Sequence, residues 1–207
     1  MKEYYMEQRS PEWYEMRKLK LTASDASTIL AMGKGLETLI GEKLAEYYSS
    51  GNYEEYTDSF TNKHIQRGVE FEEKAKSIYE LETGLTVKNV GLVVFNEHIA
   101  CSPDGLVGDD GLIEIKNHSD KVFLNLLETG KIDKKYYNQM QMQLYVTGRK
   151  WCDYFGFNPN FEPCYFKLRI YPDADVFERF NEAFPHAVAN MLQRKKAIDE
   201  LLQKSVA

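Results

Sequence analysis

The pattern of hydrophobic and polar positions predicts helices at both ends of the chain and strands in its middle. Near the N-terminus, Ser10 and Pro11 mark the start of one helix, and Thr22 starts a second that runs toward Met32. Apolar residues at helical spacing predict further helices over 36–48, 61–82, 122–127, 134–146 and 174–202. The last of these contains Pro185, where we expect a break or a kink. Alternating and β-branched stretches predict strands over 85–95, 99–102, 112–116, 151–157 and 165–170.

The order of these elements predicts the fold class. Helices come first, a cluster of strands follows, and the chain closes with a helix, two strands and a long helix. This order is typical of an α/β fold in which a central mixed β-sheet is flanked by helices. No repeat, low-complexity tract or linker rich in proline and glycine divides the 207 residues, so we expect a single domain over 1–207. The polar stretch 49–58 is expected to form a mobile loop.

Composition narrows the class of protein. With 43% hydrophobic and 28% charged residues, the chain has the composition of a soluble globular protein. It has no apolar run of membrane-spanning length, and its polar start does not resemble a signal peptide. Three separated cysteines (Cys101, Cys152 and Cys164) give neither a disulfide framework nor a zinc pattern, which favours a reducing cytoplasm.

The net charge of −6 argues against indiscriminate binding to nucleic acids. It still allows a local basic surface, because the field near a groove depends on how charges are arranged. Basic residues cluster at 17–20, 131–135 and 194–196. We interpret each cluster, taken alone, as a solvated helix face or helix end rather than as a DNA contact.

The stretch from Ser102 to Lys116 contains the main candidates for catalytic residues. It reads as a β-hairpin whose second strand alternates, so that Glu114 and Lys116 share one face. Asp104 lies on the preceding segment, across the turn signal 108–111. Two carboxylates collect a hard cation such as Mg²⁺, and a lysine beside them can orient water and offset phosphate charge. The pattern therefore indicates a metal-dependent nuclease site.

A plainer interpretation stands beside this one. A Glu-x-Lys pair occurs often on solvated strands, and Asp104 after Ser-Pro and before Gly is also ordinary turn chemistry. Geometry supplies a condition that separates the two. Asp104 can join Glu114 only if paired residue numbers in the hairpin have an even sum, which predicts a three-residue or bulged connection.

Other side chains could complete such a site. Glu72, in the helix expected over 61–82, is either a solvated glutamate or a third carboxylate for a second metal. In the helix over 134–146, Gln139 and Gln143 share a face, and an amide can hold an attacking water. We favour this role for Gln139, and an ordinary polar helix face for Gln141 and Gln143.

The start of the second helix is a candidate phosphate cradle. The residues Thr22 to Ser24 open a helix whose free N–H groups and dipole favour anions, and Arg17 could add a bidentate hydrogen bond to phosphate. The alternative is a routine helix cap beside a surface arginine. The four histidines show no metal-binding spacing and are interpreted as structural or incidental.

Six sequence blocks between Trp13 and Tyr154 resemble the lambda-type phage recombination exonucleases, also called the YqaJ-type viral recombinase group, of the PD-(D/E)XK nuclease superfamily. The blocks are Trp13-Tyr14-x-x-Arg17, Leu21-Thr22-Ala23-Ser24-Asp25, Gly68-x-x-Phe71-Glu72-x-x-Ala75, Cys101-Ser102-Pro103-Asp104-Gly105-Leu106, Gly111-Leu112-Ile113-Glu114-Ile115-Lys116 and Tyr137-x-Gln139-x-Gln141. The resemblance implies the restriction-endonuclease-like core of that superfamily. It also implies an exonuclease that digests linear double-stranded DNA from 5′ ends, giving mononucleotides and a 3′ overhang for recombination.

The resemblance also implies roles for individual residues. Asp104, Glu114 and the backbone carbonyl of Ile115 would bind Mg²⁺, and Glu72 would serve a second ion, with Mn²⁺ as an open alternative metal. Lys116 and Gln139 would position the hydrolytic water. The residues expected to hold the 5′-terminal phosphate of the DNA are Arg17, Thr22, Ser24 and Ser102.

The same resemblance implies partners, a setting and rival functions. A trimeric ring enclosing DNA, a single-strand annealing protein as partner, and a phage or prophage origin in a bacterial cytoplasm are expected, with no membrane involved. One rival is another PD-(D/E)XK enzyme, either an endonuclease or a repair nuclease. The other is a DNA-end-binding adaptor that keeps the fold without catalysis.

Overall fold

Helices surround two β-sheets in the computed structural model, which describes residues 1–49 and 59–206 and the side chains outside 50–70 and 205–207. The predicted loop 49–58, except Ser49, lies outside the described residues. The elements are β1 (Lys2–Tyr4), α1 (Pro11–Arg17), the 3₁₀ turn η1 (Ala23–Asp25), α2 (Ala26–Ala31), α3 (Lys34–Tyr48), α4 (Ser59–Thr83), β2 (Val87–Lys88), β3 (Leu92–Asn96), β4 (Ile99–Cys101), β5 (Gly105–Val107), β6 (Gly111–Asn117), α5 (Asp120–Thr129), α6 (Lys134–Thr147), β7 (Trp151–Phe157), β8 (Tyr165–Ile170) and α7 (Ala174–Val206).

The larger sheet has the strand order β2-β5-β6-β7-β8. The β6–β7 pair is parallel and the other neighbours are antiparallel, so the predicted mixed sheet is confirmed. Because parallel strands need a long crossover, α5 and α6 connect β6 to β7. The α/β fold class predicted from the order of elements is therefore correct.

The smaller antiparallel sheet, with the order β1-β3-β4, was not predicted. The single strand expected over 85–95 is in fact two strands, because β2 joins the larger sheet and β3 the smaller one. Gly91 lies between them, where an added Cβ would come within 2.4 Å of the Met6 side chain. The N-terminal segment thus passes too close for any other residue, and the chain changes sheets at this point.

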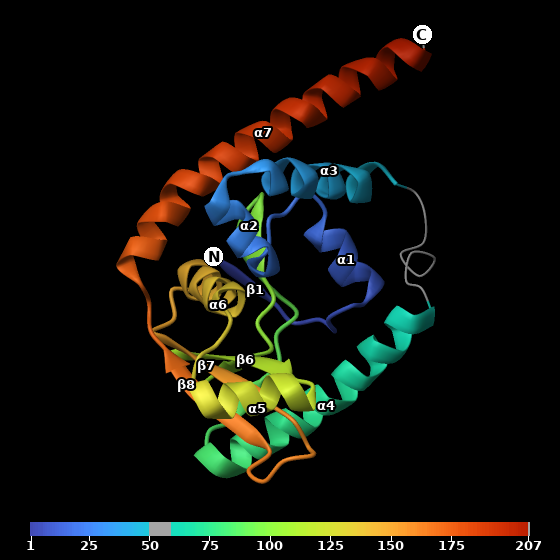
Figure 1. The fold of residues 1–207 in the computed structure, drawn as a ribbon. Helices are drawn as coiled ribbons and strands as arrows, with labels where there is room; N and C mark the ends of the chain where they lie inside the picture. Colours follow the sequence, from blue (N-terminus) through green and yellow to red (C-terminus); the bar gives the residue numbers. More distant parts are fainter. Residues whose placement is uncertain (50–58, 207) are drawn as a thin grey trace.

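The two faces of β6 are covered by different helices. Ile113 and Ile115 are buried with Ala75 and Tyr79 of α4, which confirms the alternation predicted for this strand. The opposite face carries Glu114 and packs under α6. Figure 1 shows β6 and β7 between these helices, with α6 above them and α4 below. The face of β6 that carries Glu114 is therefore covered by α6.

The N-terminal helices begin where the sequence predicts. The Ser10 hydroxyl accepts a hydrogen bond from the backbone N–H of Trp13 at 3.2 Å, and Pro11 is the first residue of α1. At Thr22 the predicted capping box is present, with the Thr22 N–H donating to Asp25 at 2.9 Å. The helix starts there as the turn η1 and continues as α2 to Ala31, one residue before Met32.

The long C-terminal helix continues through Pro185, so of the predicted break or kink the break does not occur. Proline removes one backbone hydrogen bond and crowds the preceding turn, which normally interrupts a helix. Here Phe180 and Phe184 on one side of Pro185, and Ala187 and Met191 on the other, are all buried in the same core. Packing on both sides holds α7 together across the proline, and Figure 1 shows it continuing past α3.

The helices that the structure describes include none that is both long enough and apolar enough to cross a membrane.

Candidate active site

The hairpin β5–β6 meets the geometric condition set by the sequence. Gly105 pairs with Ile113 and Val107 with Gly111, so paired residue numbers have an even sum and the connection has three residues. Gly108 opens that connection with φ +53°, a left-handed conformation that glycine adopts freely. Asp104, just before β5, accepts a hydrogen bond from the Ile115 N–H at 2.6 Å. The predicted three-residue loop is confirmed, and Asp104 lies beside the strand that carries Glu114.

Three side chains converge on the carboxylate of Glu114, which is only 1% exposed. Gln139 donates to Oε1 and Gln143 to Oε2, each at 2.6 Å, and the Lys116 ammonium lies 2.5 Å from Oε1. A buried carboxylate needs partners of this kind, because leaving its charge unpaired away from water is very costly. The arrangement fixes both oxygens of Glu114 and brings Lys116 and Gln139 to one point.

The prediction of an ordinary polar helix face for Gln141 and Gln143 is wrong. Both are fully buried, and Gln141 instead donates to the Tyr171 carbonyl at 2.8 Å, on the far side of α6 from Glu114. Gln143 belongs to the site, and the spacing of four residues from Gln139 was the signal that could have identified it. The two amides hold Glu114 from successive turns of α6.

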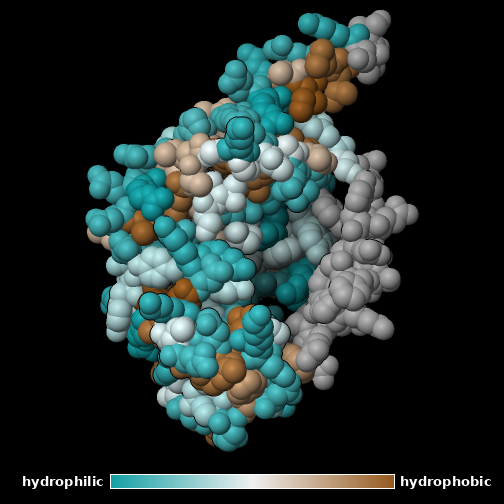
Figure 2. Space-filling view, viewed as in Figure 1, coloured by the Kyte–Doolittle hydropathy of each residue, from teal (hydrophilic) through white to brown (hydrophobic). Residues whose placement is uncertain are grey.

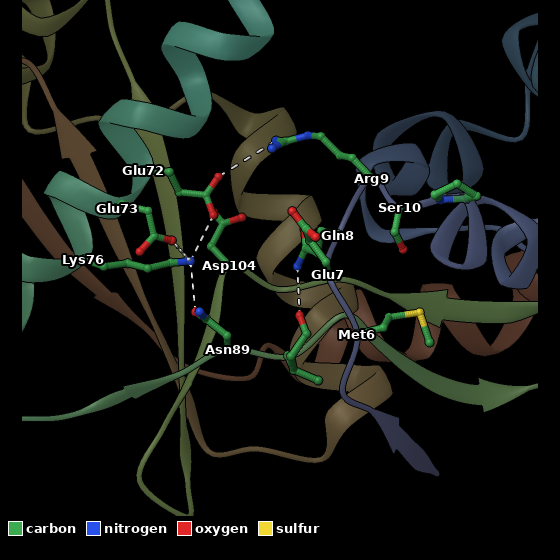
Figure 3. Close-up of a pocket in the computed structure, with 12 residues that line it drawn as sticks. Met6, Glu7, Gln8, Arg9, Ser10, Glu72, Glu73, Lys76, Asn89 and Asp104 are labelled. Atoms are coloured by element: carbon green, nitrogen blue, oxygen red, sulfur yellow. Dashed lines mark hydrogen bonds and ion pairs between the residues drawn. The ribbon is translucent and has the colours of Figure 1, made fainter. Parts of the chain in front are cut away.

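Glu72 and Asp104 line the same cavity, of about 470 Å³, beside the N-terminal segment. Figure 3 shows the two carboxylates next to one another, with Arg9 reaching toward Glu72 from the opposite wall. Glu72 forms ion pairs with Lys76 at 3.1 Å and with Arg9 at 3.9 Å. The described part of α4 therefore brings a third carboxylate to the hairpin, although it is engaged by cations in this structure.

Charges in this cluster act on one another. Burial raises the pKa of Asp104 well above its usual value, and the carboxylates of Glu114 and Glu72 raise it further, whereas Lys116 lowers it. Burial opposes the positive charge of Lys116, but Glu114 and Asp104 outweigh it and raise the pKa of Lys116. The site thus holds a charged lysine beside a buried Asp104 whose negative charge is opposed by burial and by its neighbouring carboxylates.

The donor set fits a hard divalent cation. Among the described residues, no three His, Cys, Asp or Glu side chains are grouped closely enough to hold a metal ion by themselves. Asp104 and Glu114 offer two neighbouring carboxylates, and Ile115 adds a backbone carbonyl on the same strand. Mg²⁺ suits such a set, because it binds through one or two carboxylates and keeps waters and substrate oxygens as its other ligands.

The four residues expected to bind phosphate also come together. The Arg17 guanidinium donates to the Ser102 hydroxyl at 3.4 Å and to the Thr22 hydroxyl at 3.2 Å, and Ser24 lies 3.2 Å from Thr22. Trp13, which the sequence reading did not assign to the site, donates from its indole N–H to Ser102 at 3.0 Å. This small polar pocket adjoins Asp104, two residues after Ser102.

Aromatic packing and burial orient the arginine of this pocket. Arg17 stacks on the Trp13 ring, with the guanidinium carbon 4.0 Å from the ring centroid. Burial lowers the pKa of Arg17, against the opposing effect of Asp25 and Glu46. Within the described residues, Arg17 forms no ion pair within 4.0 Å, so its hydrogen-bonding edge faces neutral hydroxyls. Such a site is suited to receive an anion.

The described surface is hollowed between two groups of helices. Figure 2 shows a hollow with mostly hydrophilic walls, between the part that carries α1, α2 and α3 and the part that carries α5.

Proteins of known structure share this fold. The alkaline exonuclease LHK-Exo from Laribacter hongkongensis is 30% identical, with a TM-score of 0.76 over 93% of this chain and 100% of that chain. The structure of LHK-Exo in complex with dAMP is equally similar, at 30% identity and a TM-score of 0.76, over 95% of this chain and 98% of that chain. A phage related exonuclease from Haemophilus somnus 129PT, 17% identical, shares the fold with a TM-score of 0.63, over 89% of this chain and 99% of that chain.

None of the curated proteins matches the sequence significantly. The family comparison is decisive: residues 12–150 match the model of the YqaJ-like viral recombinase domain. That range contains the hairpin β5–β6, Glu72 and the helix α6 with Gln139 and Gln143. It also contains the pocket formed by Arg17, Thr22, Ser24 and Ser102, which we call the arginine pocket. The chain belongs to the YqaJ-like viral recombinase family.

Proposed function

We propose that this chain is a phage-type DNA exonuclease that uses Mg²⁺ to digest linear double-stranded DNA in the 5′→3′ direction. The observation that carries the proposal is the buried Glu114, held by Gln139, Gln143 and Lys116 beside Asp104. Packing alone would not favour such a costly cluster of charges. The similarity to LHK-Exo, also solved with dAMP, supports the proposal, because dAMP is a nucleoside monophosphate of the kind we expect as product.

In this proposal Asp104, Glu114 and the Ile115 carbonyl hold the metal ion, and Glu72 serves a second ion. The bound metal would supply a more acidic water and would stabilise charge on the phosphate that is cut. Lys116 and Gln139 place the attacking water in line with the scissile bond, because both already converge on Glu114. The Lys116 ammonium also offsets the negative charge that develops on the phosphate.

The arginine pocket would hold the end of the DNA strand. Arg17, Thr22, Ser24 and Ser102 present one guanidinium and three hydroxyl groups, which suit a terminal phosphate. Since Ser102 precedes Asp104 by only two residues, a phosphate in this pocket fixes how far the strand extends to the metal site. With this distance fixed, each cut would release one nucleotide.

Replacing Arg17 with alanine should remove the preference for 5′-phosphorylated over 5′-hydroxyl ends. Hydrogen bonds to a charged group contribute about 1.5–3 kcal/mol, so we expect the wild-type preference in kcat/KM to be about 10–100-fold. The measurement is digestion of two duplexes that differ only in the terminal group. The ratio of the two rates cancels any general loss of folded protein, and Arg17→Lys should keep part of the preference. A preference that survives in Arg17→Ala would place the terminal phosphate elsewhere.

Digestion of linear duplex DNA labelled separately at its 5′ and 3′ ends tests the function itself. We expect loss of the 5′ label as mononucleotide in Mg²⁺, with closed circular DNA untouched. Cut circles would establish an endonuclease instead. Intact binding without cleavage of any substrate would establish the adaptor.

The wider setting is part of the same proposal. Residues 1–207 would act as one nuclease domain in a bacterial cytoplasm, passing the 3′ overhang to a single-strand annealing protein. A homotrimeric ring would reconcile a net charge of −6 with DNA binding, because basic residues need only line the channel. Sedimentation equilibrium should then give three times the chain mass of 24.1 kDa, and a monomer would exclude the ring.

A further inference from the structure

A second cavity, of about 580 Å³, opens at the carboxyl end of β6, between α5 and the start of α6. The side chains that matter here are three lysines and three rings: Lys131, Lys134, Lys135, His118, Tyr136 and Tyr154. We call this cavity the lysine groove. The lysines belong to the cluster 131–135 that the sequence reading took for a solvated helix end, yet they line a concave surface.

The groove carries an excess of positive charge. Its single carboxylate, Asp133, caps α6 by accepting from the Lys135 N–H at 2.8 Å and lies 3.9 Å from the Lys135 ammonium. Within the described part of the chain, Lys131 and Lys134 have no ion-pair partner within 4.0 Å. Burial, with the charges of Lys116 and Lys135, lowers the pKa of His118, so its ring adds no opposing or supporting charge at neutral pH.

The Tyr136 ring connects the lysine groove with Lys116 of the candidate active site. The Lys116 ammonium lies 5.0 Å from the centroid of the Tyr136 ring, and the Lys135 ammonium lies 4.7 Å from the same centroid. Tyr154 of β7 is the residue paired with Glu114 of β6, and its hydroxyl group is hydrogen-bonded to the His118 ring at 2.6 Å. Because Tyr136 is occupied by cations, it positions the lysines rather than offering a free face to a base.

The groove and the arginine pocket lie on opposite sides of Glu114. β6 has β5 on one side and β7 on the other. Ser102 and Asp104 lead into β5, whereas Tyr154 belongs to β7. A strand whose terminal phosphate sits near Ser102 and whose next phosphate sits at Glu114 would continue toward the β7 side.

We propose that the lysine groove binds the sugar–phosphate backbone of the cut strand, on the far side of the scissile phosphate from the strand end. This inference rests on the proposed function. Lysines bind phosphates as point charges and carry no base readout, so the contact is independent of sequence. It holds the remaining strand after each nucleotide leaves. The next phosphate can then move into the site at Glu114 without dissociation of the DNA.

The test compares Lys131→Gln/Lys134→Gln/Lys135→Gln with a control that changes three exposed lysines away from the groove, Lys150, Lys167 and Lys196, to glutamine. DNA affinity is measured in EDTA over a series of salt concentrations. Each phosphate contact contributes about 0.9 to the slope of log K against log salt, so the groove variant should lose about 2–3 from the slope and the control none. With Mg²⁺, the groove variant should show a KM raised at least about 10-fold at a nearly unchanged kcat. An unchanged slope and KM would overturn the inference.

A second measurement identifies the part of the DNA that is bound. The duplex carries neutral methylphosphonates at the first three positions beyond the scissile phosphate of the cut strand. Wild type and control should bind this duplex more weakly than the unmodified one. The groove variant, already weakened, should bind the two duplexes with nearly the same affinity. Fully additive losses would show that the lysines contact something else and would overturn the inference. Absence of cleavage by wild type would instead refute the proposed function, so the two failures are distinguishable.

Discussion

Replacing Lys116 with alanine should lower kcat for DNA cleavage by about 10³-fold while leaving DNA affinity in EDTA within a factor of about 3. The ammonium lies 2.5 Å from Glu114 and is held in its charged form by Glu114 and Asp104. It acts on the water and on the charge of the transition state, which is why kcat should change far more than binding. Single-turnover cleavage of end-labelled DNA measures the effect directly.

Lys150→Ala is the matched control for this experiment. Lys150 is also paired with a carboxylate, Asp110 at 2.8 Å, but its side chain is 73% exposed and it lies at the opposite end of the sheet. Its replacement should leave cleavage unchanged. Thermal melting checks that Lys116→Ala remains folded, because it leaves the buried Glu114 with fewer partners. Cleavage at the wild-type rate in Lys116→Ala would refute the mechanism.

Replacing Asp104 with asparagine should abolish cleavage and at the same time stabilise the metal-free protein. Asparagine keeps an oxygen that can accept from the Ile115 N–H, but it removes a charge that burial, Glu114 and Glu72 all oppose. We expect the melting temperature in EDTA to rise by about 2–4 °C, which corresponds to about 1 kcal/mol for a chain of this size. Mg²⁺ should raise the melting temperature of the wild type and leave that of Asp104→Asn unchanged.

The pH dependence of this difference follows from the direction of the pKa shift. A carboxyl group with a raised pKa binds more protons in the folded state, so its contribution to stability falls as pH rises from its ordinary pKa through the raised one. The gain from Asp104→Asn should therefore be largest at neutral and alkaline pH and should shrink toward pH 4. The control is Asp110→Asn, on the loop of the same hairpin, which removes a carboxylate that is exposed and paired with Lys150 and should not stabilise the protein at pH 8. Equal melting temperatures for wild type and Asp104→Asn at pH 8 would contradict the account.

The two variants separate chemistry from charge balance. Lys116→Ala removes the cation and should weaken the metal-free fold, whereas Asp104→Asn removes an anion and should strengthen it. Both should impair catalysis severely. Opposite effects on stability, with a severe loss of cleavage in both variants, are the result expected of a cluster assembled for reaction rather than for folding.

The sequence by itself determined the chemistry on β6. Alternation is a local property of a strand, so the positions of Ile113, Glu114, Ile115 and Lys116 fixed which side chains face α4 and which face the site. The even-sum condition for Asp104 followed from the same local rule, and the three-residue loop satisfies it. Helix starts at Ser10 and Thr22 were equally predictable, because a cap is set by its own few residues.

Only the tertiary structure decided which distant segments meet. Gln143 could not be told from a polar helix face until α6 was placed over Glu114, and Pro185 reads as a break until packing on both sides of it is seen. Arg17 and Ser102, 85 residues apart, and Lys135 and Lys116, on either side of one ring, come together only when the sheet forms. Periodicity reports which way a side chain points, whereas its partner depends on the packing of the whole chain.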